Sequence, residues 1–481
     1  TLRGRDMNTK KSVHSVISLA LFFAVIICSF SGCKFKRLSK MESITQIFDK
    51  ASENMSETAA MSASSNISVT HKRFNVTTND TITSDASYIR DKDSYSDYYI
   101  NQTIDKGETL SKTSVIYTGG ELYFNIGDET ADHILYRSTE DADSFSAFLD
   151  NILSGDTEDL SPSGFSVVDA KKSGSNVIIN MSGPDEKSLS AVDEMFLAVT
   201  EMYTESAKAT DCTFEIVITG NEKIKYEIVT AQFDCGSDSE TLSLTANTDY
   251  DTSGSVIVSP PINAGDYKAI GSVPLFWEVV KSTDDILVAD NGSFDISLKI
   301  EMPFNQYLYE NNVVANYDTD KDGLFTFSIN VDVVYKVGVQ TELGSRIIDY
   351  DGYTVKYSEN DVSAEEELSQ DEAVDYFISM VTGGSADLTF VSGVRSENVD
   401  NVKRIYFTYD SSSLSDAVIG SFGNFGLDTE SSFTIGNDCE FYYDIDKDGN
   451  YAGSGMGYTA TVTEGKQKYE CKCSYISSRT K

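Results

Sequence analysis

Beyond residue 65 the chain is mostly a succession of segments in which polar and apolar residues alternate, or in which β-branched and aromatic residues cluster. Such patterns predict β-strands. Turn signals such as Gly119-Gly120 and Gly220-Asn221 separate them. We expect strands at 66–76, 114–117, 122–126, 177–181, 214–219, 224–233 and 241–248, then at 294–302, 325–335, 346–357, 405–409, 433–443, 458–462 and 469–475. Strands and helices do not alternate, which favours antiparallel sheets.

Helical patterns are few by comparison. Apolar residues at three- and four-residue spacing from Leu38 to Met55 predict an amphipathic helix. Further helices are expected at 144–153, 189–203, 276–284, 373–381 and 414–422. So few helices cannot cover a flat sheet from outside. The sequence therefore predicts an α+β fold, mainly antiparallel β, in which a curved sheet wraps over a few helices.

Short matches recur at an offset of about 225 residues, which indicates an internal duplication. Ser188-Leu189-Ser190 recurs as Ser413-Leu414-Ser415, and Asp211-Cys212 recurs as Asp438-Cys439. The only Pro-Pro pair, Pro260-Pro261, lies between two halves of ordinary domain size. We predict two tandem β-rich units at 41–260 and 285–481, joined by a linker and entry helix at 261–284.

The N-terminal segment has the pattern of an export signal. Met7 is the expected start, and an uncharged apolar run from Val16 to Phe30 follows the basic residues Lys10 and Lys11. Residues 1–32 are therefore predicted to be a signal peptide with an upstream extension. The alternative is an uncleaved transmembrane anchor, because the run approaches the minimum length that spans a bilayer.

The apolar run ends in Phe30-Ser31-Gly32-Cys33, which resembles the lipobox of bacterial lipoproteins. Small residues before a cysteine are what the lipoprotein signal peptidase requires. Cys33 is therefore the predicted lipidation site. Residues 33–40 would form a lipidated basic tether that lies against anionic lipid headgroups.

Together with the lipobox, the order of expected strands and helices resembles the LolA/LolB and LppX/LprG group of envelope lipoproteins, best over the first unit. The resemblance implies a half-barrel, a strongly curved antiparallel sheet folded over helices, with an apolar cavity that holds acyl chains. It assigns no binding residue in this chain, because that group has no short signature to match.

The chain has 7 cysteines, and removing the signal and the anchor leaves an odd number. Cys212 and Cys235 flank an expected hairpin and could pair across it. Cys471 and Cys473 lie on one side of a strand, too extended for an easy mutual bridge. No CxxC is present, which excludes a zinc ribbon or thioredoxin-like motif. Buried free thiols are the simplest interpretation, and the disulfide state of these four residues and of Cys439 stays open.

Two segments read DxDxDG, the opening of a calcium-binding EF-hand loop. Their carboxylates belong to Asp318, Asp320 and Asp322 in one segment and to Asp444, Asp446 and Asp448 in the other. The twelfth position, where a bidentate Glu is required, holds Ile329 or Gly455 instead. We therefore expect hairpin turns, with a weak calcium site as the alternative, and predict no metal site.

Charge and motifs restrict the function. With 76 acidic and 38 basic residues the net charge is −38, which disfavours nucleic acid as a partner. Only 3 His are present, and there is neither a phosphate-binding loop nor a Ser/Lys nucleophile. Gly453, Gly455 and Gly457 lie in a strand-like segment, where close packing explains them better than phosphate. We expect no catalytic residues, no cofactor and no enzyme activity.

The sequence thus predicts a non-enzymatic lipoprotein, anchored by its N-terminal lipid to the extracytoplasmic face of a bacterial cell membrane. The ligand is expected to be apolar or amphipathic, such as a lipid, held in a cavity under a curved sheet. The alternative is a cell-surface interaction or scaffold lipoprotein with solid cores. The residues that would bind a ligand, the protein partners and the oligomeric state are not predicted.

Overall fold

The computed structural model describes residues 40–480 except 75, 92–93, 107–109, 129–133, 154–161, 201, 205–206, 237–238, 288–290, 303–305, 322–323, 360–361, 384–390, 400, 410–431, 436–439 and 465–466. The chain forms two compact units, residues 1–268 and 269–481. Each is described by itself. The predicted lipidation site Cys33 lies outside the described residues.

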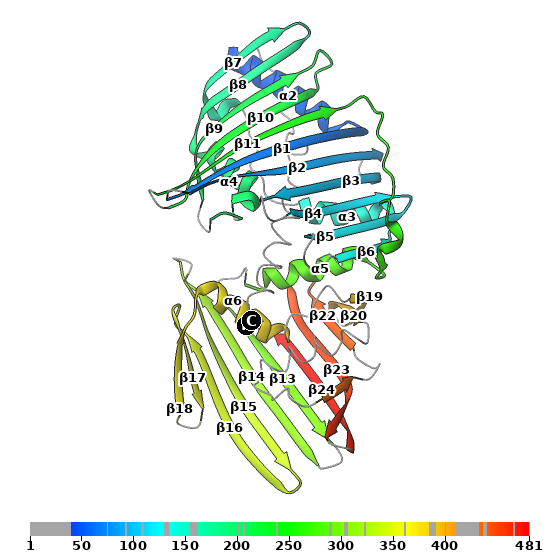
Figure 1. Cartoon of the computed structure of the whole chain (residues 1–481), viewed down its shortest axis with the longest axis vertical. Coiled ribbons are helices and arrows are strands. Elements are labelled where there is room, and N and C mark those ends of the chain that lie inside the picture. Colours follow the sequence, from blue (N-terminus) through cyan, green and yellow to red (C-terminus); the bar gives the residue numbers. More distant parts are fainter. Residues whose placement is uncertain are drawn as a thin grey trace. The chain divides into compact units, whose positions relative to one another are not determined.

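The first unit is built on one antiparallel sheet (Figure 1). Its strands lie in the order β12-β6-β5-β4-β3-β2-β1-β11-β10-β9-β8-β7. Their bounds are β1 Ala60–Arg73, β2 Val76–Asp91, β3 Ser94–Asp105, β4 Leu110–Thr118, β5 Glu121–Asp128, β6 Ile134–Thr139, β7 Phe165–Ser173, β8 Asn176–Pro184, β9 Lys208–Ile218, β10 Ile224–Asp234, β11 Glu240–Asp251 and β12 Lys268–Ala269. The helices are α2 Lys40–Ser56, α3 Ala142–Leu153 and α4 Glu186–Thr200.

The second unit has a sheet in the order β18-β17-β16-β15-β14-β13-β24-β23-β22-β20-β19, with β21 paired to β23. The bounds are β13 Asn291–Met302, β14 Tyr307–Thr319, β15 Phe325–Val337, β16 Gln340–Tyr350, β17 Thr354–Glu359, β18 Val362–Glu367, β19 Val391–Val399, β20 Val402–Tyr409, β21 Ser432–Ile435, β22 Glu440–Ile445, β23 Tyr451–Glu464 and β24 Gln467–Arg479. Its helices are α5 Val273–Asp284 and α6 Gln370–Thr382.

Both sheets follow the same route through their strands. In each unit the first strand pairs with the last long strand, β1 with β11 and β13 with β24. The next five strands, β2 to β6 or β14 to β18, extend the sheet on one side of that central pair. The strands β7 to β10, which follow α3, and β19, β20, β22 and β23, which follow α6, extend it on the other side, whereas the two-residue β12 lies next to β6.

The predicted fold class is wrong in the extent of its sheets and in how the helices are arranged with them. Strands account for 63% of the structure and helices for 19%, arranged as two large sheets rather than as a small set of helices under a sheet. The expectation failed because strands such as β2 and β3 are long and rich in Ser, Thr and Asp, so apolar periodicity did not reveal them. They enlarge the sheets well beyond the expected strands.

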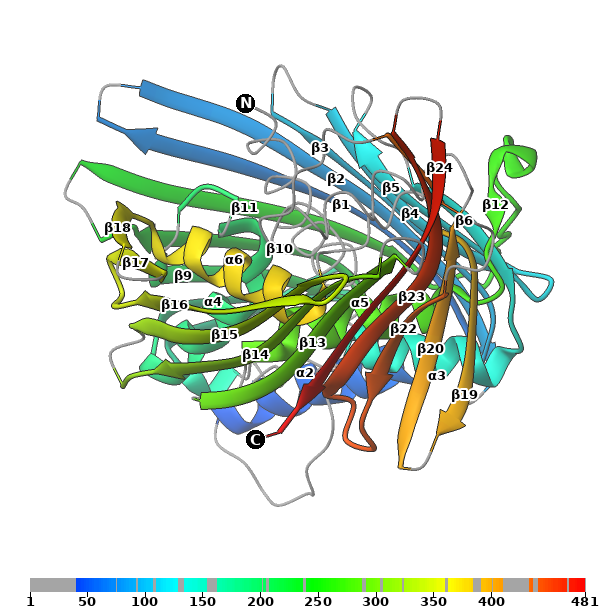
Figure 2. The ribbon, with the colours of Figure 1, turned by 90° about the horizontal axis from the view of Figure 1, so that it is seen from below.

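Alternate residues of the strands are buried, and we call that face of each sheet its inner face. In β1 the buried series runs Met61, Ala63, Ser65, Ile67 and Val69. Helices of both units contribute to this face. In the first unit the ring of Phe145 in α3 stacks on the ring of Tyr117 in β4, with the ring centroids 4.1 Å apart. In the second unit, α6 lies along the inner face of β15 (Figures 1 and 2).

In the described part of the chain, no helix combines the length and apolar character needed to cross a membrane.

Candidate functional site

Six polar side chains lie in one row across the inner face of the first sheet. They are neighbours in register from strand to strand: Glu227, Thr248, Ser65, Ser84, Gln102 and Thr113, on β10, β11, β1, β2, β3 and β4. We call them the polar row. Each is at most 5% exposed. Since adjacent strands are about 4.8 Å apart, the row extends over about 24 Å.

Apolar rows border the polar row on both sides. The row on one side consists of Val229, Ala246, Ile67, Ile82 and Ile104. The row on the other side consists of Tyr250, Ala63, Ala86, Ile100 and Val115. The polar row is therefore a hydrophilic stripe within an otherwise apolar surface.

Half of the polar row has unmet hydrogen-bonding capacity. The Thr248 hydroxyl donates to Oγ of Ser65 at 3.1 Å. By contrast, Oγ of Ser84, Oγ1 of Thr113 and both amide atoms of Gln102 are buried without a hydrogen-bond partner in the described structure. Leaving such a group unpaired costs about 1–3 kcal/mol, so these atoms are suited to a partner from outside the sheet.

The one ionisable member of the polar row is Glu227. Burial raises the pKa of its carboxyl to about 7, although the hydrogen bond from Tyr250 opposes this shift. The phenol of Tyr250 donates to Oε1 of Glu227 at 2.7 Å. Near neutral pH this end of the row therefore exchanges a proton between a neutral acid and a carboxylate.

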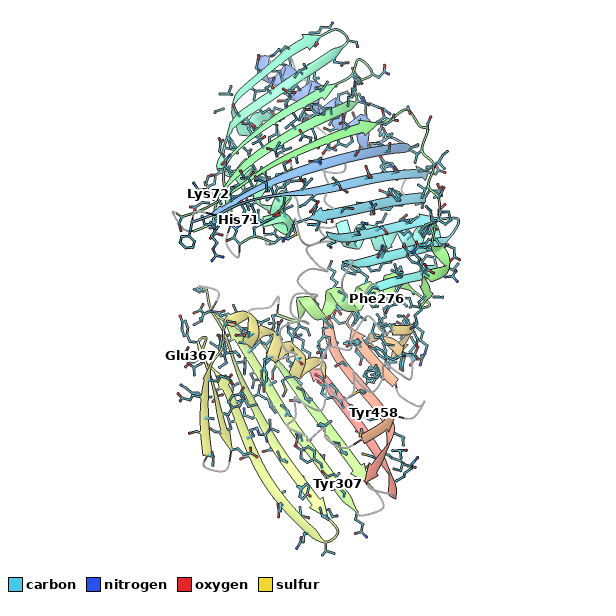
Figure 3. All side chains as sticks on the ribbon, viewed as in Figure 1. His71, Lys72, Phe276, Tyr307, Glu367 and Tyr458 are labelled. Carbon is cyan, nitrogen blue, oxygen red and sulfur yellow. The ribbon has the colours of Figure 1, made fainter. Side chains whose placement is uncertain are left out.

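A second polar cluster lies on the inner face near the end of β1 that carries His71 (Figure 3). Nε2 of His71 lies 2.7 Å from Oε1 of Glu240. The centroids of the His71 and Tyr203 rings are 5.6 Å apart. The half-buried ammonium of Lys106 lies over the Tyr203 ring and donates to the Met202 carbonyl. Burial lowers the pKa of Lys106. His71 and Lys106 thus each have a polar partner, whereas the hydroxyl of Tyr203 is buried without a hydrogen-bond partner in the described structure.

The DxDxDG residues lie where two pairs of strands turn. Asp318 is the next-to-last residue of β14 and Asp320 directly follows that strand, whereas Asp322 lies outside the described residues. Asp444 in β22 binds Arg404 through two hydrogen bonds of 2.7 and 2.8 Å. Oδ1 of Asp446 accepts backbone N–H groups of Asp448 and Asn450 at 2.8 and 2.9 Å. These carboxylates thus stabilise the turn and the strand. The described residues contain no group of three or more His, Cys, Asp or Glu placed to hold a metal.

Close packing requires Gly453 and Gly455 in β23, whereas Gly457 has open space where a Cβ would lie. A Cβ added at Gly455 would lie 2.2 Å from Cζ of Tyr442. The Tyr442 ring thus lies over a strand surface that has no side chain at this point. Its other neighbour is the guanidinium of Arg404, whose Cζ is 3.8 Å from the ring centroid.

The described cysteines are free thiols. Cys212, Cys235, Cys471 and Cys473 are all buried. Cys212 in β9 lies opposite Ala231, so the pairing with Cys235 left open above is not formed. The sulfurs of Cys471 and Cys473 lie 3.5 Å apart. Cys439 is outside the described residues.

The second sheet has a different inner face. No row across β24, β13, β14 and β15 is polar in every strand, and one of them reads Ser477, Ile296, Val313 and Val331. Aromatic rings fill the space beneath α6. Phe377 of that helix contacts Phe294, Tyr317, Phe325 and Phe327 with centroids 5.5–6.1 Å apart.

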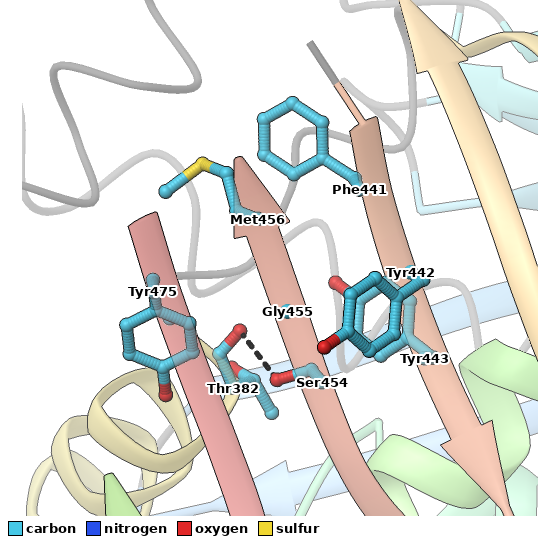
Figure 4. Close-up of a pocket in the computed structure, with 9 residues that line it drawn as sticks. Thr382, Phe441, Tyr442, Tyr443, Ser454, Gly455, Met456 and Tyr475 are labelled. Atoms are coloured by element: carbon cyan, nitrogen blue, oxygen red, sulfur yellow. Dashed lines mark hydrogen bonds between the residues drawn. The ribbon is translucent and has the colours of Figure 1, made fainter. Parts of the chain in front are cut away.

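A small cavity lies beside this aromatic core (Figure 4). Its volume is about 10 Å³, enough for no more than one water molecule. Thr382, Tyr442, Ser454 and Tyr475 are among its lining residues. The hydroxyl of Ser454 donates to the Thr382 carbonyl at 3.3 Å.

Comparison with known proteins gives little. No family model matches the sequence, and no curated protein matches it. Among solved structures, LprF from Mycobacterium bovis is similar over 44% of this chain and 92% of its own, with 10% identity and a TM-score of 0.23. At this TM-score the match carries no argument about the resemblance of the sequence to the LppX/LprG group.

Two other solved structures are similar over more of the chain but with lower scores. A putative AttH from Nitrosomonas europaea covers 86% of this chain and 92% of its own, at 6% identity and a TM-score of 0.14. Kievitone hydratase from Nectria haematococca covers 87% of this chain and 89% of its own, at 7% identity and a TM-score of 0.10. Similarity at these levels carries no conclusion about function.

Sequence reasoning missed the polar row. A signal for it exists in Ile100-Asn101-Gln102-Thr103-Ile104, where a polar residue occupies a position that alternation assigns to the buried face. The same holds for Ser65 between Ala63 and Ile67. That these positions form one row depends on the register of strands far apart in the sequence.

Proposed function

We propose that this chain is a non-enzymatic lipoprotein, anchored through Cys33 to the extracytoplasmic face of a bacterial cell membrane, and that its first unit binds an amphipathic, lipid-like ligand. The polar row and the apolar rows beside it form the ligand-binding surface. The anchor rests on the sequence pattern around Cys33, and the binding role rests on the polar row.

The observation that carries the binding role is the set of buried, unpartnered polar atoms of Ser84, Gln102 and Thr113. A sheet that served packing alone would be more stable with apolar side chains at these positions. A ligand with hydroxyl, ester or amide groups would satisfy these atoms, and its hydrocarbon part would cover the apolar rows.

The ligand proposal is tested by recovering the protein from membranes. The wild-type chain, extracted in mild detergent, should carry a co-purifying lipid in native mass spectrometry. Gln102→Leu should lose most of it, since the amide is replaced by an apolar side chain of similar size. Gln232→Leu, on an exposed position of the same sheet, is the matched control and should keep it. Equal lipid recovery from Gln102→Leu and wild type contradicts the proposal.

The anchor is tested separately. Cys33→Ser should accumulate unprocessed or lack the lipid, whereas Cys28→Ser should be processed normally. A Cys33→Ser chain of mature size that stays with the membrane would contradict the anchor, whatever the result for Gln102.

For the second unit we favour the alternative, a module with a solid core that acts through its surface. Its inner face is occupied by the aromatic side chains around Phe377, and the cavity beside them holds about 10 Å³. The common strand order supports an origin of the two units by duplication. In that case the first unit kept a ligand-binding inner face, whereas aromatic side chains came to occupy the inner face of the second unit.

A further inference from the structure

The strand β24 presents two thiols on the inner face of the second sheet. Cys471 and Cys473 are 2% and 6% exposed, and Lys472 between them points to the opposite, exposed face. The two sulfurs are 3.5 Å apart. This thiol pair plays no part in the function proposed above.

The strand geometry opposes a disulfide between these residues. Residues two apart in a strand are separated by about 6.6 Å, and their Cβ atoms by a similar distance. A disulfide requires Cβ atoms about 3.8 Å apart and sulfurs at about 2.05 Å. Since β24 is paired on both sides, with Cys473 opposite Ile300 and Tyr458, it cannot shorten at this point without losing both ladders.

The same spacing suits an ion placed between the sulfurs. Metal–thiolate bonds are about 2.3 Å long, so two sulfurs on opposite sides of an ion are about 4.6 Å apart. Each sulfur would have to move outward by only about 0.5 Å from its present position, which a small side-chain rotation provides.

The surroundings select the kind of ion. The residues paired with the two cysteines in register are Ile300, Tyr458 and Ala460, and none is a soft ligand. Zinc prefers four ligands in a structural site, and the described residues offer no third cysteine, histidine or carboxylate here. Copper(I) is soft and favours thiolates, and it is satisfied by two of them.

We propose that Cys471 and Cys473 form a two-coordinate thiolate site for copper(I). Binding replaces the two thiol protons with one Cu⁺ ion and releases two protons, with no change of oxidation state.

The site is buried, and the row of residues that contains it reaches an exposed side chain only three strands away. Cys473 shares this row with Ile300, Tyr309 and Tyr335, and Tyr335 at its far end is 38% exposed.

The test is a copper(I) titration of the reduced full-length chain without oxygen, in competition with a coloured copper(I) chelator. We expect one tightly bound ion per chain. Cys471→Ser and Cys473→Ser should each weaken binding on the order of 100-fold. The double variant Cys212→Ser, Cys235→Ser is the control, because it removes two buried thiols from the first unit, and it should bind as wild type does.

X-ray absorption spectroscopy of the copper-loaded wild type identifies the ligands directly. Its result does not depend on whether the cysteine variants fold. Two sulfur neighbours and no lighter ones are expected. A shell with nitrogen, oxygen or a third sulfur would overturn the proposal. So would unchanged affinity in Cys471→Ser and Cys473→Ser, or diamide treatment that converts the pair to an intrastrand disulfide.

Discussion

The phenol of Tyr250 in β11 donates a 2.7 Å hydrogen bond to Oε1 of Glu227 in β10, and both side chains are buried. The contact joins the polar row to one of the apolar rows beside it. It also leaves a carboxyl group in surroundings that oppose its ionisation, which has a measurable effect on stability.

Stability should depend on the ionisation of Glu227. The pKa of its carboxyl is about 7 in the folded chain and near the ordinary value of 4.5 when the chain is unfolded, so the folded state holds its proton more tightly. The resulting stabilisation is complete below about pH 4.5 and is lost as the pH rises through 7, a change of up to about 3 kcal/mol. Chemical denaturation of wild type between pH 5 and 8 should reveal this slope, and Glu227→Gln should remove it. An identical slope in both proteins would contradict the assignment.

Removing unpaired polar atoms should stabilise the ligand-free first unit. Thr113→Val keeps the shape of the side chain and deletes the unpartnered hydroxyl, so we expect a gain of about 1 kcal/mol in unfolding free energy. Thr248→Val is the comparison, because its hydroxyl is bonded to Ser65 and its loss should destabilise. Urea melts of delipidated protein measure both. A destabilised Thr113→Val would show that its hydroxyl already has a partner.

Gly455→Ala should destabilise the second unit. The added Cβ would lie 2.2 Å from the Tyr442 ring, which is also held by Arg404. Displacing the ring should cost about 1–3 kcal/mol. Gly457→Ala, two residues along the same strand with no atom within 4 Å of the added Cβ, should change stability little. Thermal unfolding compares the melting temperatures of the two variants. Equal melting temperatures would refute the packing argument.

The start of α6 depends on a reciprocal cap. Oγ of Ser369 accepts the N–H of Glu372, and the Glu372 carboxylate accepts the N–H of Ser369. Ser369→Ala should therefore cost about 1 kcal/mol. Ser363→Ala, at an exposed position of β18, is the control and should have almost no effect on the denaturation midpoint. If the two variants match, the cap contributes nothing to stability.

Local patterns predicted the helices better than the sheets. The expected helix at 373–381 corresponds to α6, because Ala373, Phe377 and Met380 repeat at helical spacing and are all buried. In β3 the inner face carries Gln102 where an apolar residue was expected, so periodicity did not reveal the strand. Long polar strands of this kind are why the sheets are larger than predicted.

The candidate site was harder to predict, because it is a property of strand register. Ser65 and Glu227 are far apart in sequence, and only the pairing of β11 with both β1 and β10 places them in one row. Single-residue chemistry gave no indication either, since serine, threonine and glutamine in a strand are ordinary surface residues. The CxC pair, by contrast, was visible as a motif, and the structure adds the sulfur–sulfur distance.

In each unit the first strand pairs with the last long strand, and this pairing determines when the sheet can be completed. β1 has one edge that stays open until β11 has been synthesised, and β13 waits in the same way for β24. Contacts between such distant parts of a chain form slowly. During that interval a central strand exposes the backbone groups of a free edge, which can pair with another chain. Truncations that remove β24 should therefore cause aggregation of the second unit rather than the loss of a peripheral strand.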